Sequence, residues 1–289
     1  MTKTKFPHRI LVATDFSPES FRALALAAKM ALPVKGTVHL LHVLELPYTV
    51  QLSREKLRSS LGSSAEGLLK EQVKMLSSTA KMPKKYITTE IIEGKPVPEI
   101  VRKASSGSFD LICIGNHISN TLSSLVFDNT TAGVIDLAPC AVLTATTRRP
   151  ETDISRIMMA SNFREGDLAL LGEVIGIAKN LKCKVDVVHV THHPEFESRL
   201  KMAGMEQLSG QTLDTRQVFF RYLYGEEVMN GLPKAVESLG SDLVVVGRER
   251  RGILNTLFGS DFIHEMVYRL EIPVLVFPLP AKAQPKPSA

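Results

Sequence analysis

The stretch RILVATDFSPES at residues 9–20 returns later in the chain as RIMMASNFREGD at residues 156–167. Each copy starts with a short apolar run, passes through polar residues and leads into a segment with helical spacing. The alignment sets Asp15 against Asn162, just beyond the apolar run. Self-similarity of this kind is the first sign of a duplicated structural unit.

Two further pairs of stretches keep the same register. VHLLHV resembles VDVVHV and pairs His42 with His189, at the same distance from the first landmark in both halves. Further on, IIEGKPVPEIVRKASSGSFDLICIG matches YLYGEEVMNGLPKAVESLGSDLVVVG and pairs Gly115 with Gly247. A register that is kept over a whole strand-helix-strand segment indicates an internal duplication.

Short β-branched apolar runs alternate with amphipathic helical segments in each half. This alternation is typical of an α/β fold in which crossover helices join parallel strands. The strands predicted for the first half cover residues 9–14, 37–44, 87–92, 109–114 and 140–146. Those predicted for the second half cover residues 155–160, 184–191, 217–223, 242–247 and 273–278. Each half is expected to form a parallel sheet with helices on both faces.

Two helices illustrate the helical pattern. Ser17 can cap the first helix and Pro18 suits its first turn. The inward face of this helix is expected to hold Phe21, Leu24, Ala28 and Leu32. Ser260 is the expected cap of the last helix of the second half. The inward side of that helix is expected to hold Phe262, Ile263, Met266, Val267 and Leu270.

The composition is that of a folded protein with two cores. The chain has 289 residues, of which 44% are hydrophobic and 22% charged, and its mean hydropathy is +0.05. This length suits two domains better than one. We place the first domain at residues 1–147 and the second at residues 154–279, on either side of the polar TTRRPETD stretch. Residues 280–289 are rich in Pro and Lys and are expected to form an extended, flexible tail.

Charge and hydropathy narrow the classes of function. A net charge of +5 and a pI of about 9.0 would suit an anionic ligand. However, Lys and Arg are scattered among acidic residues and the chain has no Trp, so nucleic-acid binding is not expected. No apolar run reaches the roughly 18 residues of a membrane span, and the N-terminus lacks the apolar segment of a signal peptide. A cytoplasmic protein without membrane attachment is expected.

Neither the cysteines nor the histidines form a recognisable reactive site. Cys113, Cys140 and Cys183 lack C-x-x-C spacing, and two of them lie in apolar strand-like runs, which favours buried structural thiols. The histidines of HVTHHP at residues 189–194 have no cysteine or carboxylate clustered with them. We interpret them as incidental rather than as metal ligands. The two histidines paired across the repeat are better explained as structural residues that flank a cleft at the strand ends.

Several of these features occur in an order that resembles the universal stress protein family over almost the whole chain, as two tandem domains. They are ILVATDFS, a second strand that ends in His-Val, and DLVVVG followed by RRG and LFGS. The resemblance implies Rossmann-like domains of the adenine nucleotide alpha hydrolase-like kind, each with a five-stranded parallel sheet. Many members of this family bind ATP. Their nucleotide signature is Gly, two residues, Gly, nine residues, Gly and then Ser or Thr, with an Asp at the end of the first strand near the adenosine.

The second half keeps an altered form of this signature. Gly247 takes the first place and Gly259 with Ser260 the last, but Arg250 stands at the second glycine and the interval is one residue short. The resemblance thus implies one site for ATP, with Mg²⁺ as its companion, in the second half. Its residues would be Asn162, Val190, Gly247, Arg250, Gly252, Gly259 and Ser260.

The arginines of the same loop are open to two interpretations. Arg248, Arg250 and Arg251 would supply guanidinium contacts to a triphosphate where backbone approach at a glycine has been lost. Alternatively, the arginines form a solvated turn, Ser260 is an ordinary helix cap and Gly259 only lets the chain turn.

The first half departs further from the pattern. Asp15 and Gly115 are kept and would belong to a degenerate counterpart of the site. The remaining signature places are taken by Ile118, Thr121, Asp128 and Asn129. Asp128, at the N-terminus of a helix, would occupy the place of a phosphate and repel it by a few kcal/mol at an effective dielectric constant of about 20. The phosphate cradle is therefore expected to be lost in this half.

The expected function is that of a non-catalytic stress protein that binds or senses an adenine nucleotide mainly through its second half. Catalysis is not expected, because neither a suitably placed carboxylate base nor a nucleophile elbow is found, and slow ATP hydrolysis is kept as a further alternative. The alternative is a nucleotide-independent scaffold that binds a partner protein or an apolar small molecule. The segments at residues 50–82 and 192–214 would provide its surface.

The two halves are expected to face each other as an internal pseudo-dimer. By resemblance to tandem family members, they would be joined through their final strands, CAVLTAT and IPVLVFP. Apolar edge strands of this kind need a partner. Further association into a homodimer is left open.

Overall fold

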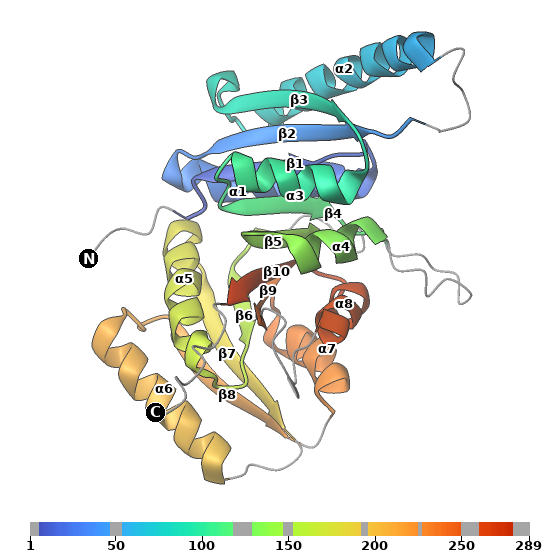
Figure 1. Cartoon of the computed structure of the whole chain (residues 1–289). Helices are drawn as coiled ribbons and strands as arrows, with labels where there is room; N and C mark the ends of the chain where they lie inside the picture. The colour runs from blue at the N-terminus through green and yellow to red at the C-terminus, as the bar shows by residue number, and fades with distance from the viewer. Residues whose placement is uncertain are drawn as a thin grey trace, which may run out of the picture.

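The computed structural model describes residues 6–46, 54–117, 129–146, 153–191, 196–224, 227–249 and 260–279. Over these ranges the chain forms two similar α/β units that share one sheet (Figure 1). Within the described ranges, no helix is both long enough and apolar enough to cross a membrane.

The strands and helices follow the predicted alternation. The first unit has the strands β1 (Arg9–Ala13), β2 (Thr37–Leu44), β3 (Ile87–Glu93), β4 (Leu111–Gly115) and β5 (Ala141–Ala145). Its helices are α1 (Pro18–Ala31), α2 (Arg54–Thr79), α3 (Pro96–Ser106) and α4 (Asn129–Leu137). The second unit has the strands β6 (Arg156–Ala160), β7 (Lys184–Thr191), β8 (Val218–Tyr224), β9 (Leu243–Glu249) and β10 (Val274–Leu279). Its helices are α5 (Glu165–Leu181), α6 (Phe196–Thr212), α7 (Val228–Leu239) and α8 (Ser260–Arg269). All ten predicted strands are confirmed, each within two residues of its predicted ends.

The strands form a single sheet in the order β3-β2-β1-β4-β5-β10-β9-β6-β7-β8. Pairs inside each unit are parallel, whereas β5 and β10 pair antiparallel at the centre. Val142 lies opposite Val276, and the Thr144 hydroxyl donates to the carbonyl oxygen of Val274 at 3.3 Å. The prediction that CAVLTAT and IPVLVFP join the two halves is therefore confirmed. Each unit covers the exposed edge of the other.

The core consists of two apolar layers, one on each face of the sheet. One layer packs against α1, α2, α5 and α6, and the other against α3, α4, α7 and α8. Successive side chains of β1 point to opposite faces of the sheet and so contribute to both layers. Ile10 and Val12 lie in the first layer, and Leu11 and Ala13 lie in the second. Both layers contain side chains from both halves, so the two units share their cores.

The two helices singled out in the sequence bury the expected faces with one exception. The Ser17 hydroxyl accepts a hydrogen bond from the Ser20 backbone N–H at 3.2 Å and so caps α1. Leu24 and Ala28 are buried, but Leu32 is 38% exposed. The prediction for Leu32 was wrong because α1 ends at Ala31 and the chain tightens into a short 3-10 helix there. On α8, the buried residues are Ile263, Met266, Val267 and Leu270.

The cysteines have the structural character that their positions predicted. Cys113 and Cys183 are buried, Cys140 is partly buried, and all three are free thiols. Burial raises the pKa of Cys140 to about 12 and that of Cys183 to about 11. The neutral thiol is therefore the stable form at physiological pH, and these side chains pack as small apolar groups.

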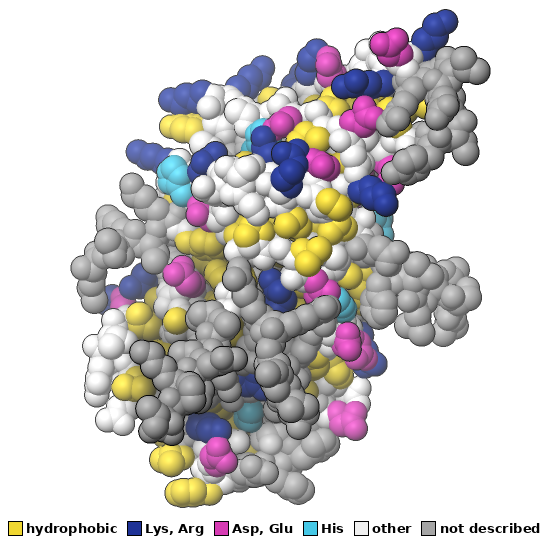
Figure 2. Space-filling view, viewed as in Figure 1, with side chains coloured by type: hydrophobic (Ala, Val, Ile, Leu, Met, Phe, Trp, Pro, Cys, Tyr) yellow, Lys and Arg dark blue, Asp and Glu magenta, His cyan; other side chains and the backbone are white. Residues whose placement is uncertain are grey.

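Charged side chains of both signs are interspersed over the described part of the face in Figure 2. Several close pairs account for this mixture. Lys201 forms an ion pair with Glu197, and Arg269 forms one with Glu265. The partners of each pair are one helical turn apart. Exposed pairs of this kind contribute little to stability, typically less than about 1 kcal/mol each.

Candidate functional site

The described residues that the sequence singled out lie at the carboxyl ends of the strands of each unit, and these two edges are on opposite sides of the sheet because β5 and β10 pair antiparallel. In the first unit, Asp15 follows β1 and Gly115 ends β4. In the second unit, Asn162 follows β6, Val190 lies near the end of β7 and Gly247 lies in β9. β1 pairs with β2 and β4, and β6 pairs with β7 and β9. The chain changes direction across the sheet at β1 and at β6, and such switch points are where open α/β sheets form ligand sites.

Most of the remaining site residues lie outside the residues that the structure describes. Outside the described residues are Arg250, Arg251, Gly252 and Gly259 of the second half and Ile118, Thr121 and Asp128 of the first. Ser260 is the first residue of α8, and the backbone there is described while its side chain is not. The phosphate end of the predicted site therefore remains a prediction.

A motif that the sequence analysis did not single out fixes the first carboxyl edge. Phe16 has a left-handed backbone with a φ of 66°, and its ring centroid lies 4.5 Å from that of His42. His42 Nδ1 lies 2.8 Å from the carbonyl oxygen of Thr14. A non-glycine residue in this backbone region is uncommon and persists only where its surroundings hold it.

The second carboxyl edge repeats this motif. Phe163 has a φ of 56°, its ring lies 4.8 Å from that of His189, and His189 Nδ1 lies 2.8 Å from the carbonyl oxygen of Ser161. The two histidines therefore have the structural role that their pairing predicted. The phenylalanines could have been found in the sequence, because the same residue follows Asp15 and Asn162.

Asp15 is held by its neighbours at the N-terminus of α1. Its carboxylate accepts a hydrogen bond from the Ser17 backbone N–H at 3.0 Å and another from the Ser17 hydroxyl, and it lies 2.9 Å from His117 Nε2. His117 Nδ1 lies 3.3 Å from Glu19. Burial would raise the pKa of Asp15, but the hydrogen bonds from Ser17 and His117 outweigh it and lower the pKa to about 2. Asp15 is thus an ionised acceptor at neutral pH.

The corresponding edge of the second unit carries a different network. The Asn162 side-chain nitrogen donates to Asp167 Oδ2 at 3.2 Å, and its oxygen accepts from Arg164 Nε at 2.7 Å. Asp167 is buried and also accepts from the Ser161 hydroxyl at 2.7 Å and from the Arg164 backbone N–H at 3.2 Å. Burial raises the pKa of Asp167. This network was not predicted from the sequence, because its members differ from those of the first half.

The two edges therefore differ in charge. In the register of the repeat, Asp15 and Glu19 of the first unit correspond to Asn162 and Gly166 of the second. The second unit has Glu165 and Asp167 where the first has Pro18 and Ser20, so each stretch carries two acidic residues. Arg164 in addition stands where the first unit has a serine. An anion would meet less repulsion at the second edge.

The paired glycines have close neighbours of their own. A Cβ atom on Gly115 would lie 2.6 Å from the backbone nitrogen of Ser20 and 2.8 Å from the carbonyl carbon of Glu19. A Cβ atom on Gly247 would lie 2.6 Å from Leu279 Cδ1. In the first unit the glycine lets α1 approach the sheet, and in the second it makes room for a leucine side chain. Packing explains both glycines, whatever ligand the edges hold.

A small cavity lies at the carboxyl edge of the first unit. Its volume is about 110 Å³. Its lining includes Thr14, Asp15, His42, Pro96, Gly115 and Thr130. Pockets that hold drug-sized ligands are larger, at about 300–1,000 Å³. The cavity brings together the two first-half residues expected from the sequence, but it is too small to enclose a whole nucleotide.

Arg248 has a different partner from the one expected. The sequence analysis placed its guanidinium on a triphosphate. In the structure the side chain is 8% exposed and donates to the carbonyl oxygens of Asp136 at 2.8 Å and Ala138 at 3.2 Å. These carbonyls lie at the C-terminus of α4 in the other half, where the helix leaves its last carbonyls unpaired and favours a cation. The expectation for Arg248 was wrong because this cross-unit partner is invisible in the sequence.

No group of three or more His, Cys, Asp or Glu side chains that could hold a metal ion occurs among the described residues. His189, one member of the histidine cluster, is turned to the Ser161 carbonyl oxygen. His192 and His193 lie outside the described residues.

The hydrogen bonds to Asp15 predict its titration. Its carboxyl is expected to titrate at about 2, well below the ordinary value of 3.8, and the substitution Ser17→Ala is expected to raise that midpoint. Because the folded-state pKa lies below the unfolded one, the stability from this group is fully present above the unfolded pKa. It is lost as the pH falls through the folded pKa. Carbon-13 NMR titration of the Asp15 carboxyl tests this, and a wild-type midpoint at 3.8 would show that Ser17 and His117 do not stabilise the carboxylate.

Known proteins share both the duplication and the fold. The universal stress protein family matches the chain twice, at residues 7–145 and 154–278. A universal stress protein of Methanocaldococcus jannaschii is 30% identical over 138 residues, which are 47% of this chain and 79% of that protein. A solved universal stress protein from Archaeoglobus fulgidus has a TM-score of 0.72 at 17% identity and covers 94% of this chain and 96% of its own. A functionally unknown protein from Pseudomonas aeruginosa has a TM-score of 0.64 at 20% identity, with coverages of 95% and 94%. At these identities the two solved structures support the fold.

Proposed function

The chain belongs to the universal stress protein family as a tandem of two domains, and on that premise we propose that it binds an adenine nucleotide, ATP, through its second half. We further propose that it acts as a non-catalytic protein of the cytoplasmic stress response. The observation that carries the proposal is the exchange of charge between the two carboxyl edges. The second edge gains the cation Arg164 where the first has Ser17, and its acidic residue Asp167 is buried and hydrogen-bonded, whereas the ionised Asp15 borders the first edge.

This exchange matters because a triphosphate brings several negative charges to the edge. In the first unit it would approach the ionised Asp15 and the sequence position of Asp128, directly before α4. In the second unit Gly259 directly precedes α8, and Arg250 and Arg251 stand nearby in the sequence. Helix N-termini attract anions through their unpaired N–H groups. Asp128 opposes a phosphate before α4; before α8, Asp261 in the first turn opposes it too, so the proposed attraction there depends on the arginines.

The absence of catalysis in this proposal rests on two residues of the second edge. Hydrolysis of ATP needs a group that orients or deprotonates the attacking water. Asn162 has no ionisable side chain at the place where Asp15 stands in the first half. Asp167 is buried and its oxygen Oδ2 already accepts from the Ser161 hydroxyl and the Arg164 backbone. Neither residue is free to serve as a base.

The substitution Gly259→Asp tests the nucleotide site. It gives the second half the residue that the first half has before its last helix. It is expected to weaken ATP binding at least about tenfold, since a carboxylate at this helix N-terminus repels a phosphate. Isothermal titration with ATP and Mg²⁺ measures the effect, after mass spectrometry has shown that no nucleotide copurifies. Unfolding temperatures should be unchanged.

The matched control is Asp128→Gly in the first half. If only the second half binds nucleotide, this variant retains the wild-type affinity and a stoichiometry near one per chain. Equal affinity for ATP in the wild type and in Gly259→Asp would contradict the proposed site, and so would the loss of binding in Asp128→Gly alone.

A second candidate function is that of an interaction protein, favoured by large apolar side chains on α2 and α6. On α6, Phe196 is 81% exposed and Leu200 is 62% exposed. On α2, the exposed apolar residues are Leu61, Leu68 and Met75. These helices belong to the two segments that differ most between the halves. Binding of a partner with no change in unfolding temperature on addition of ATP would favour this function over the first.

A further inference from the structure

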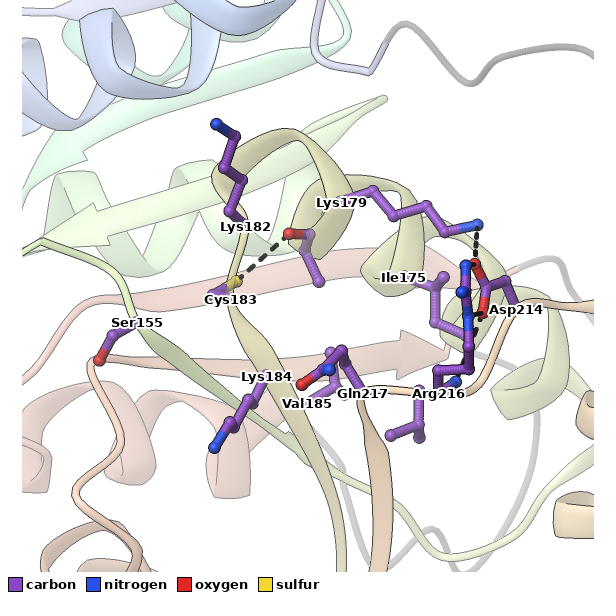
Figure 3. A pocket seen from close by; sticks show the side chains of 12 residues that line it. Ser155, Ile175, Lys179, Lys182, Cys183, Lys184, Val185, Asp214, Arg216 and Gln217 are labelled. Atoms are coloured by element: carbon purple, nitrogen blue, oxygen red, sulfur yellow. Dashed lines mark hydrogen bonds and ion pairs between the residues drawn. The ribbon is translucent and has the colours of Figure 1, made fainter.

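A second cavity lies at the amino edge of the second unit, at the other end of the strands from the proposed nucleotide site (Figure 3). Its volume is about 660 Å³. Its walls come from the end of α5, the start of β7 and the segment before β8. This volume lies inside the range of about 300–1,000 Å³ that is usual for small-molecule sites.

The cavity combines an apolar floor with cationic walls. The apolar side chains that line it are Ile175, Ala178, Val185 and Val218. The cationic side chains that line it are Lys179, Lys182, Lys184 and Arg216. Asp214 is the acidic residue of the described lining. A ligand there would contact hydrocarbon over its body and positive charge at its ends.

The cations fall into two groups at opposite ends of the cavity. At one end Lys179 Nζ lies 3.5 Å from Asp214, and the Arg216 guanidinium donates to both Asp214 oxygens at 2.9 Å. At the other end Lys182 and Lys184 extend from the chain on either side of Cys183 (Figure 3). Asp214 balances part of the charge at the first end. Among the described residues, no carboxylate lines the lysine end, where the nearby Asp242 lies behind Ser155 and accepts a hydrogen bond from its hydroxyl at 2.7 Å.

The same place in the first unit has a bulky aromatic side chain and lacks one of the lysines. The strand registers align Gln217 with Tyr86, because Val218 pairs with Val185 as Ile87 pairs with Val38. Tyr86 is partly buried and packs against the core. The registers also align Lys184 with Thr37. The second unit has therefore lost an aromatic side chain and gained a lysine at this edge.

We propose that this cavity binds an amphipathic organic anion, with the anionic group beside Lys182 and the apolar body over Ile175 and Val185. Lysine ammonium groups bind carboxylate and phosphate alike as point charges, so the shared chemistry is a single anionic group on an aliphatic or aromatic frame. An uncharged apolar molecule would lack the contact with the lysines. A small inorganic anion would leave the floor uncovered.

The test uses 8-anilinonaphthalene-1-sulfonate as the fluorescent probe on the full chain. We expect one probe molecule to bind per chain and to be displaced by both decanoate and decyl phosphate. The stronger competitor of the two shows whether the site prefers a carboxylate or a phosphate. Decanol and inorganic phosphate should displace it at least about tenfold less well, because each lacks one of the two contacts. Equal displacement by decanol and decanoate would overturn the proposal.

Two variants locate the probe. Gln217→Tyr copies the aromatic residue of the first unit and is expected to abolish binding, and Lys182→Glu is expected to weaken it about tenfold. Lys35→Glu is the matched control, because Lys35 and Lys182 share the same left-handed backbone, with φ of 55° and 58°. Unchanged binding in Gln217→Tyr, or an equal loss in both lysine variants, would overturn the proposal. Circular dichroism and unfolding temperature confirm that each variant is folded, and ATP should not displace the probe, which separates this site from the proposed nucleotide site.

Discussion

Replacement of Gly115 by alanine is expected to lower the free energy of unfolding by about 2–3 kcal/mol, because the new Cβ atom would lie 2.6 Å from the Ser20 backbone nitrogen. The carbonyl carbon of Glu19 would be only 2.8 Å away. Both atoms belong to the backbone of α1, so the helix itself must shift. Alanine also narrows the unfolded ensemble, which offsets roughly 0.4–1 kcal/mol of this loss. Denaturant unfolding of the wild type and the variant measures the difference.

Gly247→Ala is the matched control at the same position of the repeat. Its Cβ atom would lie 2.6 Å from Leu279 Cδ1, which is the end of a flexible side chain. The expected loss is about 1 kcal/mol or less, since the leucine can turn away. Equal losses in the two variants would contradict this explanation. A loss of ATP binding in Gly247→Ala with unchanged stability would instead show that this glycine serves the ligand.

The substitution Arg248→Met is expected to destabilise the protein by about 2–3 kcal/mol. The guanidinium is buried and donates to the carbonyl oxygens of Asp136 and Ala138 in the other unit. Methionine keeps much of the apolar volume but leaves these carbonyls without that donor. The midpoint of denaturant unfolding should fall, because the contact joins the two halves.

Asn116→Ala is the control for this contact, since Asn116 takes the corresponding position in the first unit. Its side-chain nitrogen donates to the Val267 carbonyl oxygen at 2.9 Å, but its own oxygen is buried without a hydrogen-bond partner. Removal of that oxygen offsets part of the cost, so we expect a loss of about 1 kcal/mol. If Arg248→Met costs no more than Asn116→Ala, the α4 carbonyls do not depend on the arginine.

The strands were predicted well because their signal is local. β1 and β6 are short, apolar and bounded by polar residues, and each is buried on both faces. Such runs are read directly from the sequence. The Ser17 cap was predicted for the same reason, since a cap depends on the next three residues. Leu32 was misplaced because helix ends depend on how the following turn packs, here a 3-10 helix.

The candidate site was predicted only in part. The repeat placed Asp15 with Gly115 and Asn162 with Gly247, each pair at the carboxyl edge of its own unit, because parallel strands bring their carboxyl ends together. It did not predict which groups hold them. His117 reaches Asp15 from 102 residues away, and that distance in sequence carries no periodic signal.

The sequence by itself determined the duplication, the α/β class and the ten strands, whereas the pairing of the two halves through their last strands was expected only from the resemblance to tandem family members. The first three features depend on apolar periodicity and on a repeated register, which are properties of neighbouring residues. Only the tertiary structure decided that Arg248 binds the other unit and that a cationic cavity opens at the amino edge beside Gln217. Both depend on side chains brought together from distant segments, where small differences in packing decide which groups meet.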